Sequence, residues 1–243
     1  MQPIILIPAR YGSTRLPGKP LADIAGKPMI VRVWEQTMAS KVGRVVVATD
    51  DQRIVAAIEA VGGEAVMTHP DHPSGSDRLW EALQVLDPQA QHKIVINVQG
   101  DVPTLASLMV QQVAELLTHS GADLATLVCR IQHSHNRENP AVVKAIISWN
   151  DDDQQTGRAL YFTRATAPWG EGELYHHIGI YAYRREALAR FVTLPPSPLE
   201  MREKLEQLRA LEAGMRMAVA RVEEEPKGID TYEQLEEIRR ELS

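Results

Sequence analysis

The sequence has one cysteine, no long apolar run and no excess of positive charge. Cys129 cannot form an internal disulfide, and its place in the apolar run LATLVC predicts a small buried residue rather than a catalytic thiol. No apolar run approaches the roughly 20 residues that a membrane-spanning helix needs. With 26 Lys and Arg against 32 Asp and Glu, the net charge of −6 argues against binding nucleic acid or an anionic membrane. An anionic substrate must therefore be bound by a local group of Lys or Arg side chains.

The start of the sequence is more typical of a first strand than of a secretory leader. Met1 leads within three residues into the apolar segment IILI, with no basic region before it and no small-residue cleavage site after it. We therefore expect a first strand at this position and a cytoplasmic protein. The 243 residues suffice for one α/β domain with a substantial core.

Short β-branched runs alternate with helical patterns in the first half of the chain. We expect strands over 4–7, 45–48, 64–67 and 94–98, and helices over 29–39, 51–61 and 76–86. Strands that are apolar on both faces and separated by helices predict a parallel sheet flanked by helices. The second half is less regular: we expect strands near 124–128, 142–147 and 178–183, helices near 104–118, 199–213 and 232–242, and an exposed turn over 150–157.

Polar segments follow three of the expected strands, where ligands of parallel sheets bind. They read PARYGSTR, TDDQ and QGDVP, and the first continues to LPGKPL. One loop thus holds Arg10, Arg15 and Lys19 with two glycines, a combination that suits a triphosphate. The loop is not a dinucleotide fingerprint, since G-x-G-x-x-G is missing, and not a Walker A loop, since Pro20 follows Gly18-Lys19.

Two aspartates are candidates for a metal site. Asp101 follows the strand over 94–98 and should project toward the basic loop, where it can supply the oxygen ligand that a hard cation needs. Aspartate is also common in a turn before proline, which is the alternative for Asp101. Asp230 precedes the last expected helix, and its local pattern indicates an N-cap that Glu233 could complete.

The segments that carry these residues closely resemble the 3-deoxy-manno-octulosonate (Kdo) cytidylyltransferases. The resemblance runs in family order through IPARYGSTRLPGKPL, VVVATDD, DHPSGSDRL, INVQGDVP, ALYFTRATAPW, HHIGIYAY, PSPLE, KLEQLRAL and GIDTYEQL. It implies an α/β, nucleotide-diphospho-sugar transferase-like (Rossmann-like) fold with a mostly parallel sheet and a smaller second-half sheet extension. It further implies one domain over 1–243, with a nucleotide-binding part over about 1–120 and a sugar-binding and dimerisation part over about 121–230.

The resemblance also implies the site residues. The nucleotide-binding set is Ala9, Arg10, Gly12, Ser13, Arg15, Lys19, Ser74, Gly75, Arg78 and Gln99. Asp101 and Asp230 are expected to bind Mg²⁺ and to be catalytic together with Lys19. The sugar-binding set is Gln99, Arg164, His177, Tyr181, Glu206 and Gln207.

Local interpretations remain open for several of these residues. Tyr181 can be ordinary strand core, and Glu206 an exposed helical charge paired with Arg202 or Arg209. Neighbouring His176 and His177 alternate across a strand, which argues against a zinc site. His133 and His135 read as surface residues without a role. One departure from the family is Val102, where many relatives have Glu.

The resemblance implies attack of the sugar's anomeric hydroxyl on the α-phosphorus of CTP, giving CMP-Kdo and pyrophosphate for lipopolysaccharide biosynthesis. The partners are then CTP, an acidic 2-keto sugar and a second copy of the chain. Alternatives are activation of a sialic acid or of the 8-amino Kdo analogue, and a non-catalytic nucleotide sensor. HHIGIYAY and PSPLE favour Kdo over sialic acid, and the retention of Asp101 and Asp230 argues against a sensor.

Overall fold

The computed structural model describes residues 2–13, 15–150, 152 and 154–242. The chain forms two compact units, one containing the residues up to Gln111 and those from Pro226 onward, the other spanning Gln112–Glu225. Helix α4 (Ser107–His119) contains the boundary between them. Within the described residues, no helix is both long enough and apolar enough to cross a membrane.

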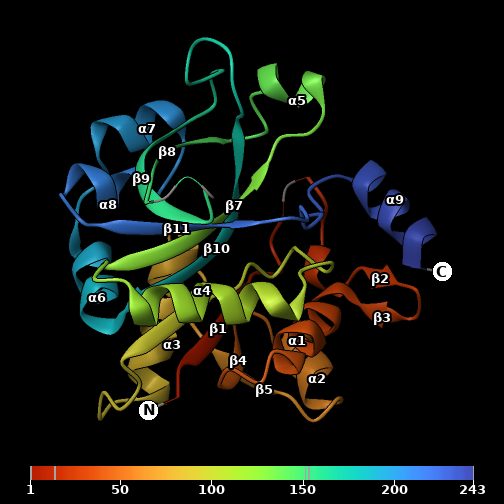
Figure 1. Ribbon diagram of the computed structural model, residues 1–243. Helices are drawn as coiled ribbons and strands as arrows, with labels where there is room; N and C mark the ends of the chain where they lie inside the picture. Colours follow the sequence, from red (N-terminus) through yellow and green to blue (C-terminus); the bar gives the residue numbers. More distant parts are fainter. Residues whose placement is uncertain (1, 14, 151, 153, 243) are drawn as a thin grey trace. The chain divides into compact units, whose positions relative to one another are not determined.

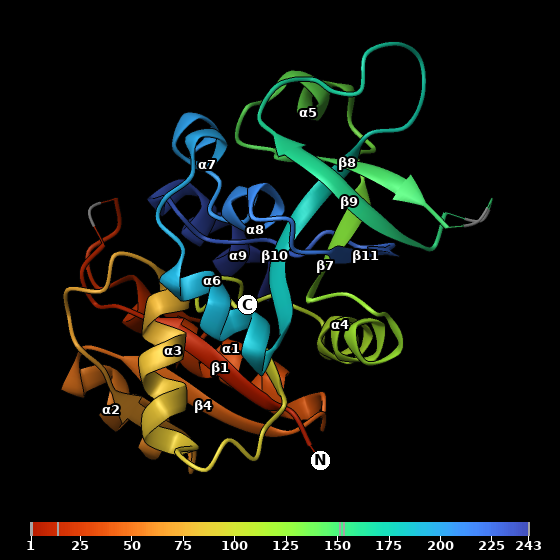
Figure 2. The same cartoon turned by 90° about the vertical axis from the view of Figure 1, so that its left-hand side faces the viewer.

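The first unit contains a parallel four-stranded arrangement. The strand order is β5 (Glu64–Met67), β4 (Arg44–Thr49), β1 (Ile4–Ala9) and β6 (Ile94–Asn97), and each neighbouring pair is parallel. Ile4 to Ile7 are fully buried because β1 is covered on both faces. Helix α3 (Gly75–Leu86) covers one face, while α1 (Met29–Ala39) and α2 (Gln52–Glu59) cover the other (Figures 1 and 2). The predicted parallel sheet with helices on both sides is confirmed.

The C-terminal segment returns to the first unit. Helix α9 (Tyr232–Leu242) lies beside the small hairpin of β2 (Asp23–Ile24) and β3 (Lys27–Pro28) in Figure 1. Its buried Leu235 and Ile238 form an apolar cluster with Leu16, Ile24, Met29 and Ile229. This packing fixes the segment that carries Asp230.

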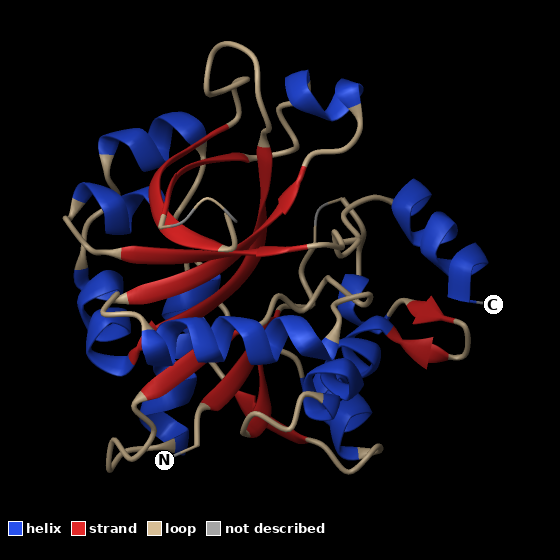
Figure 3. Ribbon diagram, viewed as in Figure 1, coloured by secondary structure: helices blue, strands red, loops and turns tan. Residues whose placement is uncertain are grey.

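The second unit contains a mixed sheet. Its order is β10 (Tyr175–Arg184), β7 (Leu124–Arg130), β11 (Met217–Val222), β9 (Thr156–Thr163) and β8 (Lys144–Trp149). Because β8 also pairs with the start of β10, the sheet closes on itself. Only the β7–β11 pair is parallel among these pairings of described residues. The helices here are α5 (Ser134–Glu138), α6 (Arg185–Thr193), α7 (Pro198–Glu203) and α8 (Leu208–Glu212) (Figure 3).

The structure corrects the sequence predictions in several places. The single helix expected over 199–213 is wrong: α7 ends at Glu203, the next residue Lys204 has a left-handed φ of 59°, and α8 begins at Leu208. Strands β9 and β11, the hairpin β2–β3 and helix α6 were not predicted, and α4 begins at Ser107 rather than near residue 104. The turn expected over 150–157 is the tip of the β8–β9 hairpin, although β9 already begins at Thr156 and Asp151 and Asp153 lie outside the described residues.

Cys129 is buried in β7, as predicted. Burial and the nearby carboxylates of Glu225 and Glu223 raise the pKa of its thiol to about 11. The thiol therefore stays protonated at neutral pH, which fits a packing role.

Candidate functional site

A pocket of about 340 Å³ lies in the first unit, at the carboxyl end of β1. It is lined by every residue that the resemblance assigned to the nucleotide and the metal ion: Ala9, Arg10, Gly12, Ser13, Arg15, Lys19, Ser74, Gly75, Arg78, Gln99, Asp101 and Asp230. The remaining lining residues are Pro8, Pro20, His72, Pro73 and Gly100. Four separate segments of the chain thus meet around one cavity.

Two glycines allow the close approach of these segments. A Cβ atom on Gly100 would lie 2.7 Å from the carbonyl oxygen of Pro8, so only glycine lets the turn after β6 pack against the end of β1. Gly18 has a φ of 69° and directly precedes the short 3-10 helix Lys19–Leu21. Both glycines serve to bring Lys19 and Asp101 to the same wall of the pocket.

The ammonium group of Lys19 lies between the two candidate metal-binding carboxylates. Its Nζ donates to Asp101 Oδ2 at 2.7 Å, to the Ile229 carbonyl oxygen at 2.9 Å and to Asp230 Oδ1 at 3.1 Å. Arg15 Nη2 is 3.0 Å from the same oxygen of Asp230. Two carboxylates that are distant in sequence therefore converge on one point, where they favour a cation.

Backbone contacts bring the C-terminal segment to Asp101. The Ile229 N–H donates to the Asp101 carbonyl oxygen at 2.9 Å, and the Lys227 N–H donates to Thr104 Oγ1 at 2.6 Å. Ile229 itself is buried in the apolar cluster of α9. The position of Asp230 is thus set by the burial of its neighbour and by main-chain hydrogen bonds.

The prediction that Asp230 caps α9 is wrong. The Gln234 N–H donates to Thr231 Oγ1 at 3.4 Å, and Gln234 Oε1 accepts the N–H of Thr231 at 3.1 Å and that of Asp230 at 2.7 Å. Thr231 and Gln234 therefore form the capping box of this helix. The carboxylate of Asp230 is left to face Lys19 and Arg15.

The start of α3 forms another part of the pocket lining. Ser74 is its N-cap: Oγ accepts the Asp77 N–H at 3.2 Å and donates to Asp77 Oδ2 at 2.7 Å. Gly75, the first residue of the helix, is exposed on the pocket. Because the first backbone N–H groups of a helix lack internal partners, this end of α3 is polar and suited to ligand contacts.

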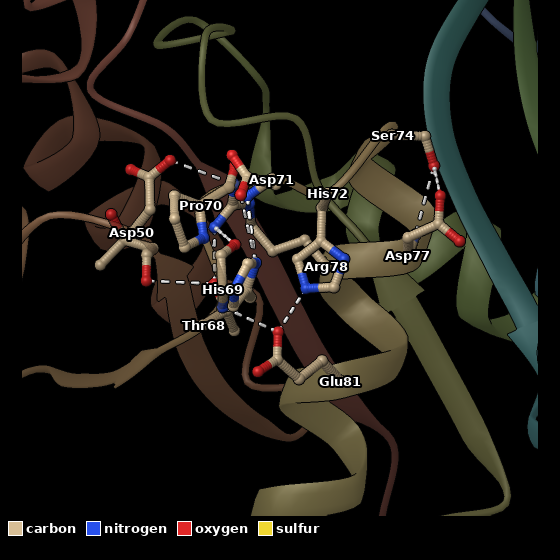
Figure 4. Close-up of polar contacts among 11 residues, drawn as sticks. Asp50, Thr68, His69, Pro70, Asp71, His72, Ser74, Asp77, Arg78 and Glu81 are labelled. Carbon is tan, nitrogen blue, oxygen red and sulfur yellow. Dashed lines mark hydrogen bonds and ion pairs between the residues drawn. The ribbon is translucent and has the colours of Figure 1, made fainter.

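Arg78 borders the pocket, but its guanidinium group is held by the protein. Only 3% of the residue is exposed. Nη1 donates to Thr68 Oγ1 at 2.6 Å, and Nη2 pairs with Asp50 Oδ2 at 3.1 Å (Figure 4). Arg78 therefore supports the wall of the pocket, and a direct contact with the nucleotide stays a prediction.

The expected sugar-binding residues other than Gln99 belong to the second unit. Arg164 follows β9, and its guanidinium group donates to the carbonyl oxygens of Glu203 at 2.8 Å and Pro140 at 2.9 Å. Its backbone N–H donates to Glu203 Oε2 at 2.9 Å. Arg164 thus links the end of β9 to the end of α7, just before Glu206 and Gln207.

His177 and Tyr181 lie inside the sheet of the second unit. The His177 ring packs against Phe162 and Tyr181, with ring centroids 4.8 and 5.4 Å away, and its Nε2 is 3.1 Å from Thr126 Oγ1. Burial, with a smaller effect of His176, lowers the pKa of His177 to about 3. Burial likewise raises the pKa of Tyr181. Both side chains are therefore neutral over the physiological pH range.

Gln207 has a buried polar atom without a partner. The residue is 8% exposed, and its Nε2 makes no hydrogen bond with any described residue. Such an atom is costly unless a ligand or a water molecule satisfies it. Neighbouring Glu206 is half-buried rather than exposed, so the expectation of an exposed helical charge is wrong.

Sequence reasoning assigned no role to two further residues. His72 lines the pocket and its Nε2 contacts Glu81 Oε2, which also accepts the His69 N–H at 2.9 Å. Lys144 in β8 is fully buried, donates from Nζ to the Asn139 carbonyl oxygen at 2.7 Å, and has a pKa lowered by burial. No local pattern in the sequence marks Lys144. The only signal for His72 is its position directly before the PSGS segment. His133 and His135 are exposed, as predicted.

Comparison with known proteins places the chain in one family. The family model described as cytidylyltransferase matches residues 4–217. The 3-deoxy-manno-octulosonate cytidylyltransferase of Parvibaculum lavamentivorans is 58% identical over 241 residues, covering 99% of this chain and 93% of that protein. The enzyme of the same name from Methylobacterium nodulans is 58% identical over 237 residues, covering 98% of this chain and 95% of that protein. A solved structure of CMP:2-keto-3-deoxy-manno-octonic acid synthetase complexed with CTP has a TM-score of 0.90 at 39% identity, covering 99% of this chain and 98% of that one.

Proposed function

Because this chain belongs to the 3-deoxy-manno-octulosonate (Kdo) cytidylyltransferases, we propose that it transfers CMP from CTP to the anomeric hydroxyl of Kdo and releases pyrophosphate. As a member of this family it is a nucleotidyltransferase. The names of its relatives support Kdo as acceptor, and the CTP in the similar solved structure supports CTP as donor. The same resemblance is the basis for a role in lipopolysaccharide biosynthesis, a cytoplasmic location and a homodimer.

The observation that carries this proposal is the meeting of the basic loop with Asp101 and Asp230 in one pocket. Arg10 is exposed there and forms no ion pair with any other described residue, so its guanidinium group is available for a phosphate. Arg15 is also largely exposed. A triphosphate in this pocket would meet Arg10, Arg15 and Lys19 together, which matches its charge.

The donor set fits a Mg²⁺ ion that shares its coordination with the nucleotide. Among the described residues, no three His, Cys, Asp or Glu side chains gather as a metal-binding group, so an all-protein site is not formed there. Mg²⁺ is typically bound by one or two carboxylates together with phosphate and water oxygens. Asp101 and Asp230 would hold it, and when bound it would neutralise phosphate charge and lower the pKa of the attacking hydroxyl.

The chain's own residues would contribute mainly orientation and charge. The sugar oxygen forms a bond to the α-phosphorus while the bond to the pyrophosphate oxygen breaks, and the cations of the basic loop stabilise the departing negative charge. Cytosine would lie near Ser74, Gly75 and Gln99, where its exocyclic amine needs acceptors that uracil leaves unsatisfied. In the second unit, the free Nε2 of Gln207 and the neutral ring of His177 would serve the hydroxyl-rich sugar.

A pyrophosphate-release screen with the four ribonucleoside triphosphates tests the donor. With Kdo and Mg²⁺ present, we expect strong preference for CTP. Lys19→Ala should reduce the use of CTP far more than it affects folding, because it removes a cation that faces the triphosphate, whereas its ion-pair partners Asp101 and Asp230 are 36% and 47% exposed and can be solvated. Equal turnover with UTP, or parental kinetics of Lys19→Ala with CTP, would contradict the proposal.

A further inference from the structure

Asp50 and Asp51 follow β4 side by side, but their carboxylates have different surroundings. Asp51 Oδ1 accepts the Arg53 N–H at 2.9 Å, which makes Asp51 the N-cap of α2. Asp50 Oδ1 accepts the Tyr11 N–H at 3.1 Å, and its Oδ2 pairs with Arg78 Nη2 at 3.1 Å. Asp50 thus contacts both the basic loop and Arg78 directly. Asp51 instead pairs with Arg53, whose guanidinium group lies 3.5 Å from the centroid of the Tyr11 ring.

Arg78, the ion-pair partner of Asp50, is buried and forms hydrogen bonds with three consecutive residues, 68–70. Besides Thr68 Oγ1, the Arg78 guanidinium group reaches the carbonyl oxygens of His69 at 3.3 Å and Pro70 at 3.5 Å (Figure 4). This segment leads into the residues that line the pocket before α3. The side chains of Arg78 and Asp50 are 4% and 13% exposed, so removing either one leaves the other buried without its ion-pair partner.

Tyr11 follows Arg10 in the basic loop. The hydrogen bond from its N–H to Asp50 holds the backbone at the point where the loop leaves β1. Asp50 does not itself line the pocket. Asp50 thus links the basic loop to the segment before α3, and both of these segments contribute residues to the pocket lining.

We propose that Asp50 is a positioning residue for nucleotide binding, which acts by fixing the basic loop through Tyr11 and the segment before α3 through Arg78. The proposal rests on the proposed function, since it concerns the same pocket. A site whose walls are held in place before the ligand arrives loses less free energy in ordering them when it binds. Loss of the link should therefore weaken CTP binding more than it slows the bound enzyme.

Asp50→Asn tests this with little change of shape. The amide oxygen can still accept the Tyr11 N–H, but its NH₂ group presents donors to the donors of Arg78, so one of the two contacts fails. We expect the Kd and KM for CTP to rise on the order of tenfold, with kcat at saturation within about threefold of the parent. Asp71→Asn is the matched control, because it removes the same charge from the segment before α3 at a side chain that is 87% exposed. Parental CTP affinity of Asp50→Asn, or an equal loss in Asp71→Asn, would overturn the proposal.

The double variant Asp50→Asn/Arg78→Gln separates positioning from direct contact. If Arg78 acts with Asp50 as one support, the double variant binds CTP about as weakly as the worse single variant. Fully additive losses would mean that Arg78 contacts the nucleotide independently of Asp50, and the proposal would be wrong.

Hydrogen exchange without nucleotide distinguishes failure of this inference from failure of the proposed function. Asp50→Asn should speed the exchange of peptides covering Tyr11 and residues 68–75, whether or not the parent binds CTP. Unchanged exchange in both peptides would overturn the inference. If Asp50→Asn does not fold, Thr68→Val keeps the test open, because it removes the shorter of the two contacts of Arg78 Nη1, together with the hydrogen bond from Thr68 to the Thr49 carbonyl oxygen, and should still weaken CTP binding severalfold. Parental affinity of that variant would refute the role of this link.

Discussion

Asp230→Asn and Thr231→Ala separate two roles that the sequence placed on one residue. Thr231 caps α9, so Thr231→Ala should cost about 1 kcal/mol of stability. For a chain of 243 residues, that lowers the Tm by about 2–4 °C. Turnover should stay close to that of the parent, because the Thr231 hydroxyl serves the helix.

Asp230→Asn should have the opposite effect. Its side chain is 47% exposed, so the ion pairs with Lys19 and Arg15 contribute about 0–1 kcal/mol to folding. The carboxylate nevertheless faces the point where phosphate and metal charges meet, and loss of such a group commonly lowers kcat on the order of 10²-fold. That corresponds to about 2.7 kcal/mol of activation free energy.

Both variants need the same two measurements: kcat from pyrophosphate release at saturating Mg²⁺, CTP and Kdo, and Tm from thermal unfolding. The reasoning predicts a slow, stable Asp230→Asn enzyme and an active, less stable Thr231→Ala enzyme. Turnover of Asp230→Asn within threefold of the parent would refute the assignment of Asp230 to the metal site. Asp101→Asn should behave like Asp230→Asn, and the double variant should be impaired by less than the product of the single effects.

Two further predictions concern Lys19 in the first unit and His177 in the second. Lys19 Nζ lies where the carboxylates of Asp101 and Asp230 converge, so it competes there with a metal ion. Lys19→Met should therefore bind Mg²⁺ at least tenfold more tightly than the parent in a calorimetric titration without nucleotide. Equal Mg²⁺ affinities of the two proteins would contradict that placement. His177 has a folded-state pKa of about 3, below its unfolded value of about 6.5, so between these values the unfolded chain binds the extra proton and stability falls as the pH is lowered. His177→Gln should lose less stability between pH 7 and pH 4 in urea unfolding, and parallel curves for the two proteins would show that the ring is not held neutral.

The first half of the fold follows from local patterns. The run IILI is apolar at every position because β1 is covered on both faces, and α1 spans 29–39 as its apolar spacing predicts. In the second half, β9 alternates buried Gly157 and Ala159 with exposed Arg158 and Leu160, a period-2 pattern that could have been recognised. The break between α7 and α8 could not, because Lys204 adopts a left-handed conformation while Arg164 binds the carbonyl oxygens at that end of α7.

In the site, too, some residues could be recognised from their local sequence, while others depend on contacts that only the folded chain makes. Asp101 was predictable because it lies in the polar turn after a buried strand, where it should project toward the basic loop. Asp230 was predictable only from the family resemblance, because its local sequence indicates a cap and the burial of Ile229 brings its carboxylate to Lys19. Asp50 and Asp51 are indistinguishable as neighbours in TDDQ, since only the folded chain shows which one turns toward Arg78.

The central claim is CTP-dependent activation of Kdo, and it is tested most directly by the product. The purified protein is incubated with CTP, Mg²⁺ and either Kdo or N-acetylneuraminic acid, and CMP-sugar and pyrophosphate are quantified by mass spectrometry and a coupled assay. The account predicts CMP-Kdo and pyrophosphate in equal amounts, with kcat/KM for Kdo at least tenfold above that for the sialic acid. No CMP-Kdo, or a higher kcat/KM for N-acetylneuraminic acid, would contradict it.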